Sequence, residues 1–239
     1  MMLRELLSVF RSDDPLARLG HEFSEMLSLG RLITVKAGGH FFEGTLTRQE
    51  DLDLHEEDRK INDLQRVIRK AVVTHLTLGL PGHQIPYALL IMSLADEAEQ
   101  IGDHALALAG IRRDLAASLS GDDPVMEELR TIRRSVERAF AEVDEVFAGA
   151  ESTRARELIE ECRDLRARAE GLFVTVAQGD YSPPQASALV VASGHYARIA
   201  IHLTQILAGV VLPLHELNLY EEDQLGQFLE QQQGDDGSD

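Results

Sequence analysis

The stretch of sequence that decides the fold reads IPYALLIMSLADEAEQIGDHALALAGI, from Ile85 to Ile111. Wound as a helix, it places apolar or small residues around most of its circumference, which is typical of a helix packed on several sides. The formally charged residues in this stretch are all acidic, and they are Asp96, Glu97, Glu99 and Asp103. We therefore expect a long buried helix that carries an acidic group near its middle.

The surrounding sequence predicts five more long helices, because start and stop signals recur at helical spacing. Thr47-Arg-Gln-Glu50 and Ser182-Pro-Pro-Gln185 have the pattern of capping boxes, and two Asp-Pro pairs mark further starts. Gly38-Gly39 is expected to end the first helix near Ala37. The six expected helices span about 15–37, 48–79, 84–118, 124–148, 152–178 and 183–212.

Six helices in two sets of three predict an all-α protein made of two tandem antiparallel three-helix bundles. A Gly-Asp-Asp-Pro break at Gly121 is expected to separate them. The expected division is a first bundle at 1–120, a second at 121–231 and a disordered tail at 232–239. Short terminal helices are expected as well, over 1–11 and 215–231.

A weak internal repeat supports this division. Glu99 to Ala109 and Ala197 to Leu207 share isoleucine and histidine at equivalent places, with His104 matching His202. The two acids of the first half have apolar counterparts in the second, which are Ala197 for Glu99 and Ile201 for Asp103.

The charge balance excludes some classes of function. With 23 basic and 41 acidic residues the net charge is −18, which opposes binding to nucleic acid or to anionic lipid. A single Cys162 rules out a disulfide within the chain and a cysteine-rich zinc site. Neither a signal peptide nor a membrane-length apolar run is present, so we expect a cytoplasmic protein with at most peripheral membrane contact. Nucleophile elbows and phosphate-binding glycine loops are missing too, which argues against an enzyme.

Acidic side chains on two neighbouring helices form a candidate metal site. Asp96, Glu99 and Asp103 are three and four residues apart, so they share one helix stripe, and no Lys or Arg of this stretch compensates them. Asp58 and Asn62 form a polar stripe on the preceding helix, which an antiparallel neighbour could place opposite. Oxygen ligands from two helices suit a hard divalent cation or an iron-type metal.

Other readings of these residues stay open. The acids could form a solvated face, or pair across helices with Arg59 or Arg66. The chain would then be a metal-free helical adaptor. An iron storage or oxidase bundle is a further alternative, but none of the nine histidines lies in a Glu-x-x-His pair. We expect most histidines to serve packing, while His104 could supplement the acidic site.

Two of these stretches resemble motifs of a known family. Glu99-Gln-Ile-Gly-Asp-His104 resembles the E-R-I-G-D-H core of PhoU and PhoU-like phosphate-transport accessory proteins. Asp58, with Ile61, Asn62 and Leu64, resembles the family's D-x-x-I-D/N-x-L stretch. The resemblance extends from the helix at Asp14 to about Leu212, and it implies two similar three-helix bundles.

The same resemblance implies a function. PhoU-like proteins restrain phosphate uptake and phosphate-responsive signalling, acting with a phosphate transporter and often a sensor kinase at the inner membrane face. Some bind iron or zinc clusters through acidic motifs in both halves. Because the second half lacks those acids here, the resemblance implies one metal site, with Fe, Zn, Mn or Mg as the ion. The low charge of the sixth expected helix also favours a homodimer.

Overall fold

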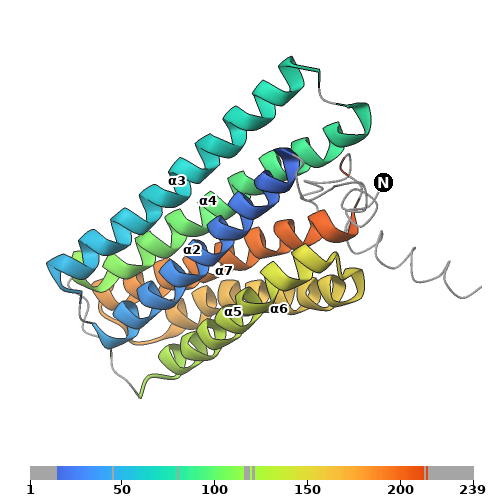
Figure 1. Cartoon of the computed structure of the whole chain (residues 1–239). Helices are drawn as coiled ribbons and strands as arrows, with labels where there is room; N and C mark the ends of the chain where they lie inside the picture. The colour runs from blue at the N-terminus through green and yellow to red at the C-terminus, as the bar shows by residue number, and fades with distance from the viewer. Residues whose placement is uncertain are drawn as a thin grey trace, which may run out of the picture.

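The computed structural model describes residues 15–44, 46–79, 81–115, 119, 122–212 and 214, and over these ranges it is all-α. Figure 1 shows the chain path through the long helices. These are α2 (Pro15–Glu43), α3 (Arg48–Thr77), α4 (Ile85–Asp114), α5 (Pro124–Gly149), α6 (Ser152–Gln178) and α7 (Pro183–Val211), with a short 3₁₀ helix, η1 (Gly82–Gln84), before α4. The predicted fold class is confirmed, and the described residues contain no strand.

The helices form two three-helix bundles that lie side by side (Figure 1). In the first, α2, α3 and α4 pack against one another, and in the second α5, α6 and α7 do so. Contacts of α4 with α7 and of α2 with α5 join the two bundles. The domain boundary stays a prediction, because 116–118 and 120–121 lie outside the described residues. So do both predicted terminal helices and the tail.

Local hydrogen bonds explain where several helices begin. Thr47 Oγ1 accepts from the backbone N–H of Glu50 at 3.2 Å, while a Glu50 carboxylate oxygen accepts from Thr47 N–H at 2.8 Å. Ser182 and Gln185 form the equivalent capping box on α7. Asp123 caps α5 by accepting from the N–H groups of the second and third residues that follow it. Both capping boxes and the second Asp-Pro start are therefore confirmed.

The predicted end of the first helix is wrong, because α2 continues through Gly38 and Gly39 to Glu43. Gly38 is buried where α2 meets the second bundle. A Cβ atom there would lie 2.9 Å from Nε of Arg133 and 3.0 Å from the hydroxyl oxygen of Tyr196. This glycine therefore permits close packing between helices and does not act as a helix stop.

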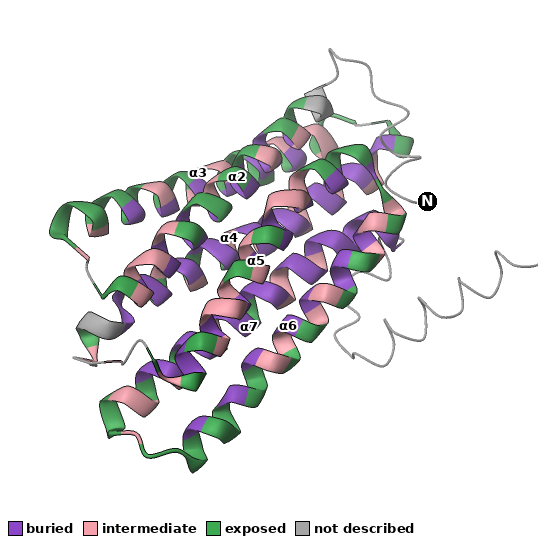
Figure 2. Ribbon diagram, turned by 90° about the horizontal axis from the view of Figure 1, so that it is seen from below, coloured by how far each residue is buried: buried purple, intermediate pink, exposed green. Residues whose placement is uncertain are grey.

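One continuous apolar core runs through both bundles. Buried residues, purple in Figure 2, follow the faces that the helices turn toward one another. Helix α7 is buried along most of its length because α4, α5 and α6 all pack against it. Its low charge therefore reflects packing within the chain. No helix in the described ranges combines the length and apolar composition needed to cross a bilayer.

Candidate functional site

Asp58 on α3 lies against the glycine at the centre of the acidic stretch on α4. A Cβ atom at Gly102 would sit 3.2 Å from Oδ1 of Asp58 and 3.1 Å from Cδ1 of Ile61. The missing side chain thus lets α3 approach α4 within one turn of Glu99 and Asp103. Asn62 Nδ2 donates to the other oxygen of Asp58, Oδ2, at 3.2 Å. The structure brings the two predicted stripes to facing surfaces of adjacent helices.

The carboxylates at this contact act on one another electrostatically. Burial, followed by the charge of Asp103, raises the pKa of Asp58, and His55 counteracts this in part. Burial, then Asp103, also raises the pKa of Glu99, with Asp58 adding to the effect. Only 9% of Asp58 is exposed, and its Oδ1 has no hydrogen-bond donor among the described residues. A buried oxygen without a partner, beside other acids, is an environment that a bound cation would relieve.

Asp96 lies apart from this group. Its Oδ1 accepts from Nη2 of Arg69 at 2.6 Å and from Nε2 of Gln65 at 3.2 Å, both on α3. An interhelix ion pair therefore exists here, between Asp96 and Arg69. It differs from the alternative left open by the sequence, which was a pair of the acidic motif with Arg59 or Arg66. Arg69 already compensates the negative charge of Asp96. The role of Asp96 as a metal ligand stays a prediction.

The side-chain oxygens at this contact are of a type that binds metal ions. Carboxylate and amide oxygens from two helices are ligands that hard cations prefer. As the side chains are placed, however, the described part of the chain gathers no three His, Cys, Asp or Glu residues around a point that one ion could occupy. Glu99 is half-buried and Asp103 is exposed, so both have room to rotate toward Asp58.

A second cluster of ionisable side chains lies between the bundles, where α4 packs against α7. Nδ1 of His104 is 3.4 Å from Nδ1 of His195, and the His104 and His202 rings stack with their centroids 5.4 Å apart. Nδ1 of His202 is 2.8 Å from Oε2 of Glu97. Sequence reasoning assigned most histidines to packing. The seven-residue spacing of His195 and His202, and the equivalence of His104 and His202, were the signals for this cluster.

Burial favours the neutral form of His104 and of His195. It lowers the pKa of His104 to about 4, with the neighbouring His202, His195 and Arg198 contributing in that order. Burial also lowers the pKa of His195, and Arg198 adds to this effect. Neutral imidazole has one ring nitrogen with a free lone pair, which is the form that binds metals or accepts hydrogen bonds.

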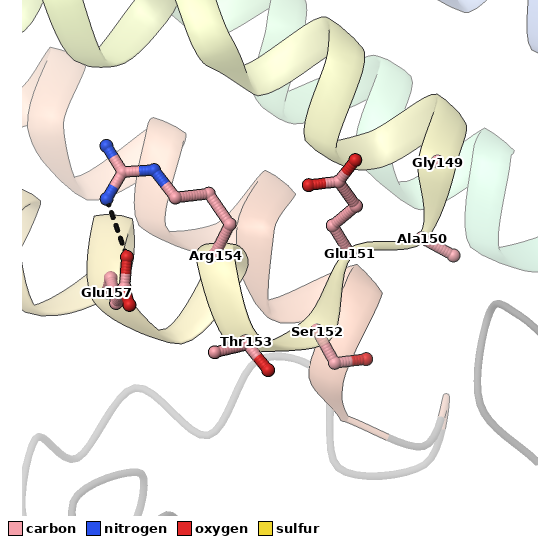
Figure 3. Close-up of a pocket in the computed structure, with 7 residues that line it drawn as sticks. All are labelled: Gly149, Ala150, Glu151, Ser152, Thr153, Arg154 and Glu157. Carbon is pink, nitrogen blue, oxygen red and sulfur yellow. Dashed lines mark hydrogen bonds and ion pairs between the residues drawn. The ribbon is translucent and has the colours of Figure 1, made fainter.

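Three cavities among the described residues lie away from both groups. One of about 520 Å³ opens at the loop between α5 and α6, lined by residues 149–154 and Glu157 (Figure 3). Two others, of about 490 and 390 Å³, lie between α2 and α3. None of the three is lined by the acids at the α3–α4 contact or by the histidine cluster.

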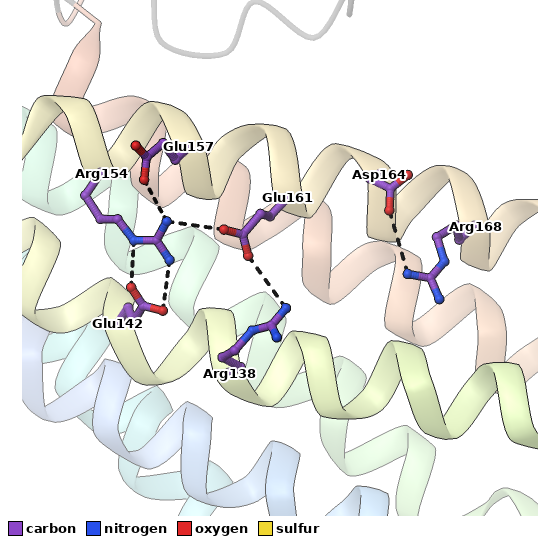
Figure 4. A network of polar contacts seen from close by, with 7 residues as sticks. All are labelled: Arg138, Glu142, Arg154, Glu157, Glu161, Asp164 and Arg168. Carbon is purple, nitrogen blue, oxygen red and sulfur yellow. Dashed lines mark hydrogen bonds and ion pairs between the residues drawn. The ribbon is translucent and has the colours of Figure 1, made fainter.

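Arg154 in the first cavity is already compensated. It donates to both carboxylate oxygens of Glu142 on α5, at 2.7 and 2.9 Å, and to Glu157 and Glu161 on its own helix. Figure 4 shows how Glu161 extends this network to Arg138. The network connects α5 to α6, so this cavity offers no unpaired arginine for an anion.

Comparisons with known proteins support the fold. No protein-family model matches the sequence, and no curated protein matches it. Among solved structures, the chain is similar to the phosphate transport system regulatory protein PhoU from Streptococcus pneumoniae, with a TM-score of 0.65. The match covers 86% of this chain and 96% of that one, at 19% sequence identity. At this identity the likeness concerns the fold, and the chain therefore has a PhoU-like fold.

Proposed function

We propose that this protein regulates phosphate uptake and phosphate-responsive signalling by contact with a phosphate transporter or a sensor kinase. The observation that carries the proposal is the similarity of fold to a phosphate transport regulator over nearly the whole of both chains. The proposal is also supported by the motif around Glu99 and Asp103, which resembles that of phosphate transport regulators. This motif lies on the surface of α4 that faces α3. In this role the protein acts by binding partners and has no catalytic function.

A metal ion in the first bundle is the second part of the proposal. Glu99 and Asp103 would be the main ligands, with Asp58 and Asn62 supporting them from α3. A divalent or iron-type cation would supply the positive charge that these carboxylates lack, and it would tie α3 to α4. Its presence or absence could then change the shape of the bundle that a partner recognises.

The proposed partners act at the inner face of the membrane, and the protein would reach that face through them. A net charge of −18 suits partners that present basic surfaces. Homodimerisation remains part of the proposal, although α7 is covered within the chain and does not offer its apolar surface for it.

A metal-free helical adaptor is the second candidate function. The observation that favours it is the pairing of Asp96 with Arg69, together with the lack of three converging donors in the described ranges. The adaptor would keep the same partners and lose the dependence on metal. Elemental analysis separates the two candidates.

The regulatory role is tested by disrupting the gene in the source organism and measuring uptake of radiolabelled phosphate in phosphate-rich medium. We expect uptake to rise on disruption and to fall again when the parent gene is restored. A Glu56→Ala/Asp63→Ala variant, which removes two exposed acids of α3, is expected to restore regulation as well. Unchanged phosphate uptake and unchanged phosphate-responsive transcription after disruption would refute the proposal.

The metal site is tested by elemental analysis of the untagged protein, before and after dialysis against divalent ions. The Glu99→Ala/Asp103→Ala variant is expected to hold less metal than the parent, because it loses the acidic site, while circular dichroism shows unchanged helix content. The Glu56→Ala/Asp63→Ala control should keep it. A parent protein that retains no metal under any of these conditions would favour the adaptor.

A further inference from the structure

The histidine cluster joins the two bundles at the centre of their contact. Helices α4 and α7 run antiparallel, since His104 meets His195 while Glu97, earlier on α4, meets His202, later on α7. The four side chains therefore come in pairs, one from each bundle. None of them belongs to the acidic group at the α3–α4 contact.

The distance between His104 and His195 is unusual for a hydrogen bond. Their Nδ1 atoms are 3.4 Å apart, beyond the usual N–H···acceptor range of about 2.7–3.2 Å. Two imidazole nitrogens bound to one tetrahedral zinc ion, at bond lengths of ~2.0–2.1 Å, are held ~3.3 Å apart. The observed separation thus matches a pair of ligands on one ion better than it matches a good hydrogen bond.

Glu97 prepares His202 as a third ligand. When the Nδ1–H group of His202 donates to Glu97, the free lone pair of this ring lies on Nε2. Carboxylates fix metal-binding histidines in this way, and they also make the ring a stronger donor. The side chains of His202 and Glu97 are 16% and 11% exposed, so the pair is largely shielded from solvent.

One movement is required for three ligands to meet. As placed, the His202 ring stacks on His104 with an interplanar angle of 25°, so its nitrogen does not point at the His104–His195 pair. This is why no three donors converge in the described structure. Rotation of the His202 side chain would direct Nε2 toward the pair, and the Glu97 carboxylate would have to move with the ring to keep its contact with Nδ1. The exposed Arg198 is a cation close to this group.

We propose that His104, His195 and His202 form a binding site for a borderline transition-metal ion of the zinc class, which clamps the first bundle to the second. Imidazole donors select zinc, cobalt, nickel or copper over the hard cations that oxygen ligands prefer. This site is independent of the proposed acidic site, because the two share no ligand and differ in donor type, imidazole nitrogen here and oxygen there. Water would complete the coordination of the ion.

The test uses the untagged full chain, freed of metal by chelation, and Co²⁺ as a probe whose visible absorption reports coordination geometry. We expect one equivalent of Co²⁺ to produce the intense bands of a four-coordinate ion. In His104→Gln/His195→Gln the affinity should fall roughly 10- to 100-fold or more. A His21→Gln/His83→Gln control, which replaces two exposed histidines, should bind like the parent.

The Glu99→Ala/Asp103→Ala variant separates this site from the acidic one. It is expected to keep the Co²⁺ bands, so that loss of the acidic site leaves the histidine site intact. Zinc X-ray absorption of the parent needs no variant, and at least two nitrogen ligands per ion are expected. An oxygen-only shell, or equal Co²⁺ affinity in the parent and the folded His104→Gln/His195→Gln variant, would overturn the proposal.

Discussion

Asp58 is a residue whose position costs stability in the absence of a cation. Its Oδ1 is buried without a donor, next to Asp103. Burial raises its pKa, so the folded protein binds more protons than the unfolded chain just above the unfolded pKa of about 3.9. The contribution of Asp58 to the free energy of unfolding is therefore most favourable below the unfolded pKa. This contribution decreases as the pH rises through the folded pKa.

We expect Asp58→Asn to raise the free energy of unfolding at pH 7 by about 1 kcal/mol in metal-free protein, because it removes a buried charge. Urea unfolding at pH 7 and pH 4 measures the effect, and the difference should shrink at pH 4, because the raised pKa of Asp58 makes the folded protein bind a proton there more readily. The exposed Asp63→Asn should change little at either pH. A loss of stability in Asp58→Asn at pH 7 would show that the carboxylate is satisfied as it stands.

Cys162 reports on opening of the second bundle. It is 0% exposed, and burial, followed by the charge of Glu161, raises the pKa of its thiol to about 12. Thiolate is the reactive form, and at pH 8 only ~0.01% of such a thiol is ionised, compared with a sizeable fraction near the free pKa of about 8.5.

A disulfide reagent at pH 8 should therefore label Cys162 at least ~100-fold more slowly in the native protein than in urea. Because the chain has one cysteine, the whole signal belongs to this residue. Stopped-flow absorbance measures both rates. Rapid labelling under native conditions would mean that α6 and α7 separate readily around this position.

At the scale of helices, a glycine sets the closeness of α4 and α7. A Cβ atom at Gly209 would lie 2.9 Å from Cδ1 of Leu94 and 3.3 Å from Cδ1 of Leu90. Gly194, earlier on the same helix, is exposed and would meet nothing within 4 Å. The two glycines share a helix and differ only in their surroundings.

Gly209→Ala should destabilise the protein by about 1–3 kcal/mol, since overpacking outweighs the gain in helix propensity. Gly194→Ala, the matched control, should stabilise it by roughly 0.5–1 kcal/mol, because alanine restricts the unfolded chain and favours helix. Thermal unfolding of both variants beside the parent gives the comparison. Equal shifts in the two variants would mean that α4 and α7 have room between them.

At the scale of the whole molecule, the two bundles share one apolar core. Helices α4 and α7 bury residues against each other as well as against their own bundles. Separating the bundles would expose these surfaces to water, and the cost rises in proportion to the apolar area exposed. The structure therefore resembles one cooperative unit more than two independent domains.

Scanning calorimetry of the intact chain is expected to show a single transition, with a calorimetric enthalpy close to the van't Hoff enthalpy. Gly209→Ala should move this transition to lower temperature without splitting it. Two resolved transitions, or a calorimetric enthalpy well above the van't Hoff value, would show that each bundle unfolds by itself.

Local signals in the sequence determined the number of helices and most of their starts. Capping at Thr47, Asp123 and Ser182 depends on side chains within a few residues of the hydrogen-bond donor, so it can be recognised without knowledge of the fold. The spacing of the acids on α4 likewise follows from helical geometry. The PhoU-like fold was predicted from these motifs, and the structure and its neighbour confirm the architecture.

Only the tertiary structure decided what depends on contacts between distant segments. A glycine in the sequence does not show by itself whether it ends a helix or lets two helices approach. Gly38 and Gly102 are both points of close approach, and the partner of each lies on another helix. The pairing of Asp96 with Arg69 and the meeting of three histidines between the bundles depend on helix register and on which helices pack together. These are properties of the assembled molecule, because side chains far apart in sequence acquire their environment only when the helices pack.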